Sequence, residues 1–197
     1  PKEYSFEWSG MSLQEKIAGD STLITFTFVI IVVFMVLAAQ YESWILPLMI
    51  MIPVPLVMLG ALLALQYANL PMNVFAQIGL VLLIAMSSKN AILIIEFAKE
   101  LRESGKTIID SAIESAVSRF RPILMTIFSF IFGIIPLAVA TGAGAETQRT
   151  IGIALLGGMA MATLVALFIV PVIYVLLEAM RETVVDVQQE VKMRESL

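Results

Sequence analysis

The sequence predicts an all-α transmembrane protein built as a five-helix bundle. Of its 197 residues, 59% are hydrophobic and only 14% are charged, against roughly 45–50% and about 25% in soluble domains. So few charged residues could not cover the surface of a soluble protein of this length. In addition, five apolar runs are long enough to cross a bilayer, which takes about 20 helical residues per crossing. The mean hydropathy of +0.95 agrees with this class.

The first 21 residues precede the first apolar run. Tyr4–Gly10 alternates like a short strand, and Ser12–Gly19 is predicted as a helical turn or two that ends at the glycine. Because a lone short strand is not stable by itself, we expect residues 1–21 to be the end of an extramembrane domain with a connecting helix. The chain begins at Pro1, without a signal peptide, and we expect it to be processed, excerpted or broken out of a longer protein.

The transmembrane bundle is predicted to occupy residues 22–179, followed by a polar tail at 180–197. Short polar or glycine-rich connections separate its apolar runs, except between the third and fourth. There, charges alternate with apolar residues at helical spacing, which predicts an amphipathic helix at about 99–119 lying along the membrane surface. The predicted spans are residues 22–39, 46–67, 74–97, 122–140 and 151–177.

Small residues predict where the helices pack closely. A stripe of glycine and alanine at intervals of four lets a neighbouring helix approach, and two spans carry one. The residues are Gly60, Ala64 and Ala68 on the second span, and Ala154, Gly158, Ala162 and Ala166 on the fifth.

The distribution of lysine and arginine predicts the orientation, because these residues are enriched in cytoplasmic segments. Most of those outside the spans fall on one side, which we assign to the cytoplasm together with the C-terminus. The N-terminal end, after five crossings, then lies on the outer, periplasmic side. The cytoplasmic set is Lys99, Arg102, Lys106, Arg119, Arg121, Arg181, Lys192 and Arg194, and the outer set is Lys2, Lys16 and Arg149.

Lys89 lies within the third span, in the polar stretch Ser87–Asn90. A lysine near the centre of a membrane helix costs about 2.5–3.5 kcal/mol on insertion scales. Four consecutive polar residues surround a helix, so this stretch should face protein or water. The only acid within any span, Glu96, lies two turns away. We therefore predict an ion or proton relay whose acidic partner is supplied elsewhere; alternatively, Lys89 only snorkels or bonds to carbonyls of a neighbouring helix.

Arg119 and Thr126 are seven residues apart and therefore share a helix face. Taken alone, Thr126 could simply bond to a carbonyl of its own helix, and Arg119 could anchor the helix at the interface. Their combination with Lys89 favours a functional role.

Four motifs resemble the resistance–nodulation–division (RND) efflux transporters, and the hydrophobe/amphiphile, AcrB-like group best. They cover nearly the whole chain in the family's order. The motifs are LAAQYESWILP (Leu37–Pro47), SSKNAILIIEFAKE (Ser87–Glu100), SRFRPILMT (Ser118–Thr126) and TGAGAETQRTIG (Thr141–Gly152).

The resemblance implies that the spans correspond to helices eight to twelve of a twelve-helix, proton-driven multidrug pump of the bacterial inner membrane. Lys89, Asn90, Arg119 and Thr126 would form the lysine, arginine and threonine half of its proton relay. The expected partners are helices one to seven with their aspartate pair, two further protomers of a homotrimer, a periplasmic adaptor protein, an outer-membrane channel and lipid, but no nucleic acid. The chain alone should be incomplete.

Other functions are also considered. A metal-ion or lipid exporter of the same superfamily is one alternative, and a scaffold or inhibitory bundle that does not transport is another. The chain contains no cysteine and no histidine, which removes the usual general base and the commonest metal ligands. We therefore predict a transporter segment rather than an enzyme, without a cofactor or metal.

Overall fold

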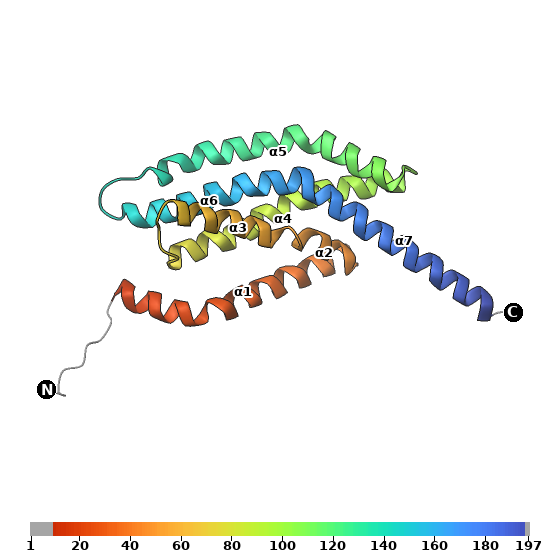
Figure 1. Ribbon diagram of the computed structural model, residues 1–197, viewed down its shortest axis with the longest axis horizontal. Coiled ribbons are helices and arrows are strands. Elements are labelled where there is room, and N and C mark those ends of the chain that lie inside the picture. The colour runs from red at the N-terminus through yellow and green to blue at the C-terminus, as the bar shows by residue number, and fades with distance from the viewer. Residues whose placement is uncertain (1–9, 196–197) are drawn as a thin grey trace, which may run out of the picture.

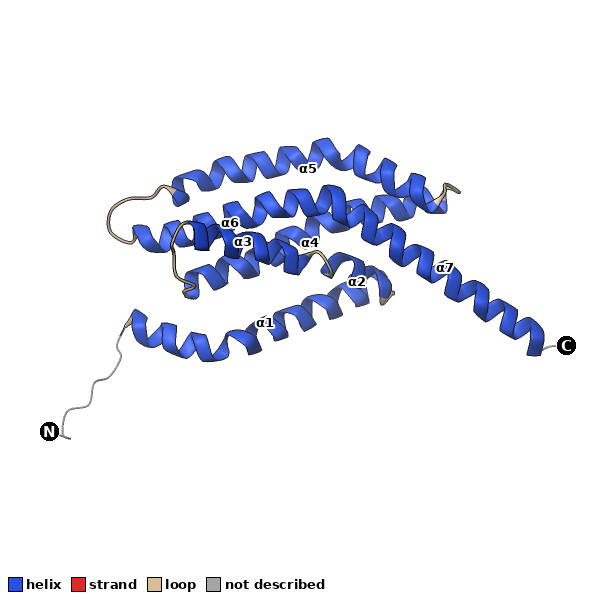
Figure 2. Cartoon of the chain, in the orientation of Figure 1, coloured by secondary structure: helices blue, strands red, loops and turns tan. Residues whose placement is uncertain are grey.

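The computed structural model describes residues 10–195, and within that range the regular structure is entirely helical (Figures 1 and 2). The strand predicted at Tyr4–Gly10 lies outside the described residues, apart from Gly10. The elements are α1 (Met11–Tyr41), α2 (Ile45–Met51), α3 (Val54–Tyr67), α4 (Val74–Glu103), α5 (Ile108–Ala138), α6 (Ala145–Leu164), the π-helical turn η1 (Val165–Ile169) and α7 (Val170–Glu195).

Five helical stretches are long and apolar enough to cross a membrane, which confirms the predicted class. Each contains most or all of one predicted span, although several extend further at their ends. The stretches are Leu23–Tyr41, Ile45–Tyr67, Val74–Glu103, Ile108–Ala138 and Ala145–Thr183.

The helices alternate in direction, so their connections gather at two ends of the bundle (Figure 1). Residues 42–44 and 104–107 lie at one end, which we call the turn end, and α7 extends beyond it. Residues 68–73 and 139–144 lie at the other, the loop end, where α1 also begins. This alternation is the arrangement that five successive crossings require.

Two predicted helix boundaries are wrong. The helix predicted to end at Gly19 continues, because α1 runs unbroken from Met11 to Tyr41. The separate amphipathic helix predicted at 99–119 does not form: its first residues complete α4, and the remainder begins α5, which passes through Pro122 without a break. In both cases the composition changes along the helix while the backbone continues, so hydropathy misplaces the boundary.

Prolines mark the places where two spans depart from regular helix. The second span is interrupted at Ile52 and Pro53, between the end of α2 at Met51 and the start of α3 at Val54. The fifth span contains the π-helical turn directly before Pro171, with the Val170 amide donating to the Val165 carbonyl. A proline cannot donate to the carbonyl four residues earlier, and its ring clashes with that carbonyl. The wider turn accommodates this disruption without ending the helix.

Helix α6 is the central packing element of the bundle (Figure 1). A Cβ atom added at Gly157 would lie 2.8 Å from a backbone oxygen of α3, and one at Gly60 would lie 3.0 Å from a backbone oxygen of α6. Gly158 lies against α4, and Gly152 lies against the backbone at the end of α5. The predicted stripe on the fifth span is therefore buried, and the closest approach to α3 uses its neighbour Gly157.

Helix α1 is the least embedded of the five. Only Leu37 among its described residues is fully buried, and side chains such as Leu23 (81% exposed) face outward. It meets the bundle at α2 and α4. A large apolar surface is thus left for lipid or for another protein segment.

Candidate functional site

The polar stretch of α4 is divided between the interior and the exterior of the bundle. Ser87, Ser88 and Asn90 are each 5% exposed, whereas Lys89 is exposed. The Ser88 hydroxyl donates to the Ile84 carbonyl at 2.8 Å, so it is satisfied within its own helix. The buried Asn90 amide nitrogen has no hydrogen-bond partner among residues 10–195. The predicted polar cluster therefore exists, but its lysine points away from the five-helix core.

Lys89 lies on an outer face of α4 that is apolar on its N-terminal side and carries the exposed Glu96 seven residues later. Ile78 and Leu82 precede it by eleven and seven residues, which puts all three on one stripe, and both are exposed (54% and 43%). Among the side chains that the structure describes, no carboxylate forms an ion pair with the Lys89 ammonium group. Its only local acidic candidate, Glu96, accepts instead from the Tyr41 hydroxyl of α1 at 2.9 Å.

The Tyr41–Glu96 hydrogen bond lies beside a cavity of about 280 Å³ between α1, α2 and α4. Lys99 also lines this cavity, but its ammonium group is 3.8 Å from Glu103, in the next turn of α4. Glu96 is thus hydrogen-bonded to α1, on the side of the turn end. Glu96 therefore shares a face with Lys89 but forms its described contact with Tyr41, and no described carboxylate pairs with Lys89.

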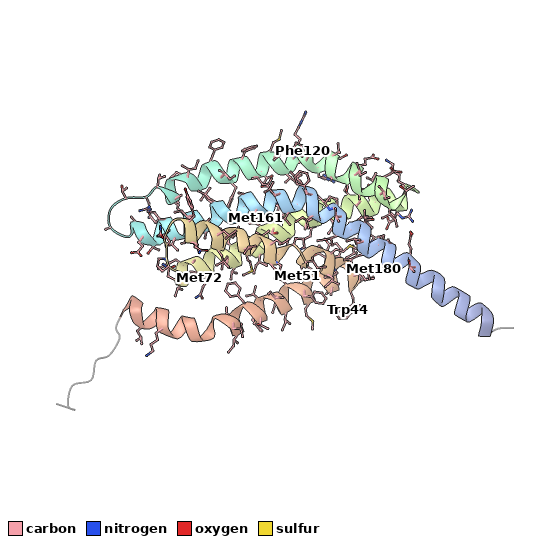
Figure 3. The ribbon with its side chains drawn as sticks, in the orientation of Figure 1. Trp44, Met51, Met72, Phe120, Met161 and Met180 are labelled. Atoms are coloured by element: carbon pink, nitrogen blue, oxygen red, sulfur yellow. The ribbon has the colours of Figure 1, made fainter. Side chains whose placement is uncertain are left out.

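Arg119 lies on α5 and faces an aromatic ring rather than an acid. Its guanidinium carbon is 4.7 Å from the centroid of the Phe97 ring on α4. Its Nε atom is buried without a hydrogen-bond partner among the described residues. In contrast, neighbouring Phe120 is 48% exposed and points away from the bundle (Figure 3).

Thr126 follows two turns later on α5. It is exposed, and its hydroxyl donates to the Pro122 carbonyl at 3.0 Å. Within residues 10–195, no hydrogen bond or ion pair joins Lys89, Asn90, Arg119 and Thr126 to one another. The structure therefore places these residues on two adjacent helices but does not link them directly.

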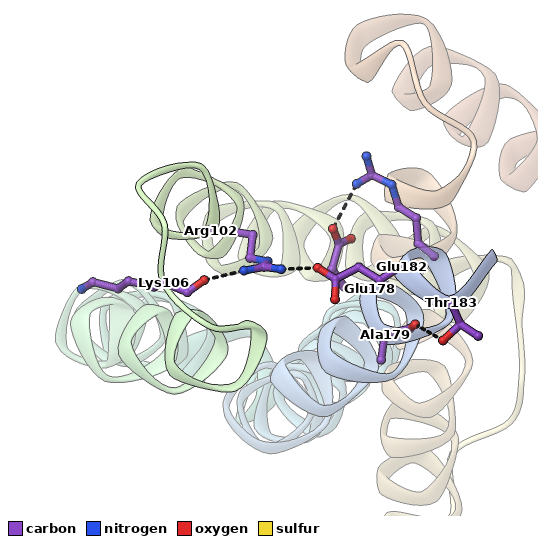
Figure 4. Close-up of polar contacts among 7 residues, drawn as sticks. Arg102, Lys106, Glu178, Ala179, Glu182 and Thr183 are labelled. Carbon is purple, nitrogen blue, oxygen red and sulfur yellow. Dashed lines mark hydrogen bonds and ion pairs between the residues drawn. The ribbon is translucent and has the colours of Figure 1, made fainter. Parts of the chain in front are cut away.

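A polar cluster at the turn end was not predicted from the sequence. Arg102 forms an ion pair with Glu182 of α7, and its second nitrogen donates to the Lys106 carbonyl at 2.7 Å (Figure 4). Arg181 pairs with Glu178 one turn along α7, at 3.0 Å. This cluster joins the α4–α5 turn to α7. Arg102 and Glu182 are 80 residues apart, so spacing along the sequence gives no signal for it.

Residues 10–195 contain no group of three or more acidic side chains positioned to hold a metal ion, and the chain has no histidine or cysteine. The chemistry that remains is that of buried amides, hydroxyls and isolated cations within an apolar bundle. Such intramembrane polar groups are typical of ion and substrate pathways.

A helical bundle with five stretches that are long and apolar enough to cross a membrane defines the class of multi-pass membrane proteins. The chain belongs to the AcrB/AcrD/AcrF family, whose model matches residues 1–178. The RND resemblance is thereby confirmed. Relatives of this chain carry the names of membrane transporters of efflux pumps.

Several curated relatives match most of this chain. The toluene efflux pump membrane transporter TtgB of Pseudomonas putida is 45% identical over 175 residues, which are 89% of this chain and 17% of that protein. Escherichia coli provides two more, the multidrug export protein AcrF and the multidrug resistance protein MdtF. Each is 44% identical, over 178 and 179 residues respectively, or 90% of this chain and 17% of the relative. The chain thus spans about a sixth of these proteins.

Proposed function

We propose that this chain forms a transmembrane segment of a proton-driven multidrug efflux pump, in which Lys89, Asn90, Arg119 and Thr126 provide one half of the proton relay. Membership of the AcrB/AcrD/AcrF family supports the transporter class. The names of the relatives, which include toluene efflux and multidrug export, favour amphiphilic organic cargo over metal ions.

The observation that carries the proposal is the position of Lys89. Its side chain leaves α4 on an outer face, and no acid among the side chains that the structure describes pairs with it. A charged lysine facing lipid near mid-membrane would cost about 2.5–3.5 kcal/mol on insertion scales. A carboxylate on another helix removes that cost by forming an ion pair. We therefore assign this face of α4 to contact with the other half of the pump, helices one to seven, with their aspartate pair opposite Lys89.

Proton transfer then acts by changing which groups pair with the Lys89 ammonium group. When the opposing carboxylates are ionised, they hold the Lys89 ammonium group. When they take up a proton, the ion pair weakens and Lys89 turns toward polar groups on its own side, such as Asn90 and Thr126. The unpartnered Asn90 amide is compatible with this role because it leaves hydrogen-bonding capacity beside Lys89. A local change in charge thereby biases two helix packings, as in other electrostatic switches.

The remaining assignments follow from the same proposal. The turn end faces the cytoplasm with the C-terminus, and the loop end and N-terminal side face the periplasm. The complete pump is a homotrimer that exchanges inward protons for outward drugs. It works with a periplasmic adaptor protein and an outer-membrane channel.

The test replaces Lys89 in a full-length pump that carries this segment. Lys89→Ala should abolish efflux of a fluorescent dye while the amount of pump in the membrane is unchanged. The matched control is Lys99→Ala, which removes an exposed lysine ten residues further along the same helix and should retain efflux. Normal dye efflux by Lys89→Ala would exclude Lys89 from the coupling mechanism.

A further inference from the structure

The aromatic contact of Arg119 goes beyond the set of residues that the relay proposal uses. The ion pairs of the described chain use Lys99, Arg102, Lys106 and Arg181, and none uses Arg119. Its guanidinium group instead lies over the ring of Phe97, 4.7 Å from the centroid. Because its Nε atom is buried and has no partner in residues 10–195, the ring is the specific contact that the structure provides for this cation.

Phe97 is well placed to control where Arg119 lies. It belongs to α4, eight residues after Lys89, and it contacts the helix that carries Arg119. The negative face of an aromatic ring attracts a cation, and guanidinium groups in particular stack on such rings. Unlike a carboxylate, the ring has no proton to exchange and cannot neutralise the cation. It can therefore fix the position of Arg119 while leaving its charge available.

We propose that Phe97 is a positioning residue for Arg119, holding its guanidinium group against α4, the helix that also carries Lys89 and Asn90. This inference rests on the proposed function, since it gives Phe97 a role only if Arg119 takes part in coupling. The proposed role also requires the negative π face of the Phe97 ring, and not only the volume of the side chain. A residue that merely filled space between α4 and α5 would be replaceable by any apolar side chain of similar size.

The size of the expected effect follows from the strength of the contact. Cation–π attraction of the usual magnitude changes the equilibrium constant between the positioned and the released guanidinium group by about 2- to 30-fold. Replacing Phe97 by leucine should therefore lower the initial rate of proton-driven dye efflux by a factor in that range. Phe97→Tyr and Phe97→Trp keep a π face and should retain most of the rate.

The experiment measures dye efflux from cells that contain a full-length pump with this segment, normalised to the amount of pump in the membrane. Phe97→Leu and Phe97→Met provide two non-aromatic variants, so that poor accumulation of one does not end the test. Phe120→Leu is the matched control, because Phe120 is adjacent to Arg119 in sequence but points outward. Its rate should equal that of the unmodified pump.

Fluorinated phenylalanines at position 97 separate electrostatics from packing. One, two and three ring fluorines weaken the negative face stepwise while changing the volume little. The rate should fall with each fluorine if the ring holds the cation. A flat series, or non-aromatic variants as active as the aromatic ones, would overturn the role of Phe97.

A separate arm tests the proposed function itself. Arg119→Ala should abolish efflux; if it does not, the relay assignment fails and the role of Phe97 fails with it. If Arg119→Ala is inactive and the fluorinated series is flat, only the positioning role is refuted. The two failures are thus distinguishable in one set of variants.

Discussion

Gly152 lies where α6 meets the end of α5, and its replacement by alanine tests how tightly the bundle is packed. A Cβ atom there would be 2.6 Å from the backbone nitrogen of Ala138 and 2.9 Å from its Cα atom. Ordinary contacts of a Cβ atom begin at 3.4 Å, so the two helices would have to separate by about 0.8 Å. No side chain can rotate away, because the atoms that would be met belong to the backbone.

Overpacking of this kind costs about 1–3 kcal/mol of folding free energy. For a chain of this length, that corresponds to a decrease in Tm of roughly 2–12 °C. The assay is thermal unfolding of the purified chain in detergent, followed by fluorescence-detected size exclusion. Gly152→Ala should unfold within that interval below the unmodified chain.

Gly133→Ala on α5 is the matched control. A Cβ atom at Gly133 meets nothing within 4 Å, and alanine is the better helix former by about 0.5–1 kcal/mol. Its Tm should be unchanged or slightly higher. Equal melting temperatures for the two variants would refute the close approach of α6 to α5.

Three further predictions use other contacts of the bundle. Asn73 caps α4 by accepting from the Ala76 amide at 2.9 Å, so Asn73→Ala should lower the free energy of unfolding by about 0.5–2 kcal/mol while Asn73→Asp retains it; chemical unfolding of both variants checks this. Arg102→Gln should lower the Tm more than Lys99→Gln, because Arg102 joins separate elements whereas Lys99 pairs within one helix; equal shifts would contradict this. Because the chain lacks cysteine, a membrane-impermeant maleimide applied from the periplasmic side should label Thr141→Cys and spare Ser104→Cys, and the opposite pattern would reverse the orientation.

The spans could be predicted from sequence because membrane solvation acts on composition alone. An apolar run of sufficient length identifies a crossing without knowledge of its neighbours. Helix ends are a different property, since they depend on local backbone bonding. The passage of α5 through Pro122 and of α1 through Gly19 was therefore not predictable from hydropathy.

The residues of the candidate site could be predicted from the sequence, but their arrangement in space could not. A lysine beside polar residues in an apolar run is visible in the sequence, whatever its rotation about the helix axis. That Lys89 points outward while Asn90 is buried depends on which face of α4 packs against its neighbours. Phe97 gave no signal at all, because one phenylalanine among many in apolar runs is indistinguishable from a packing residue.

The two contacts of Arg102, with Glu182 and with the Lys106 carbonyl, have a mechanical consequence. This guanidinium group links α7, through Glu182, to the backbone of the α4–α5 turn, through Lys106. A sliding motion of α4 along its axis must either break that linkage or carry α7 and the first turns of α5 with it. Helix α1, which is attached mainly through apolar contacts and the Tyr41–Glu96 hydrogen bond, is not bound by the same linkage. An axial shift of α4 would thus be passed to α7 and to the start of α5 through Arg102, and to α1 only through the separate Tyr41–Glu96 contact.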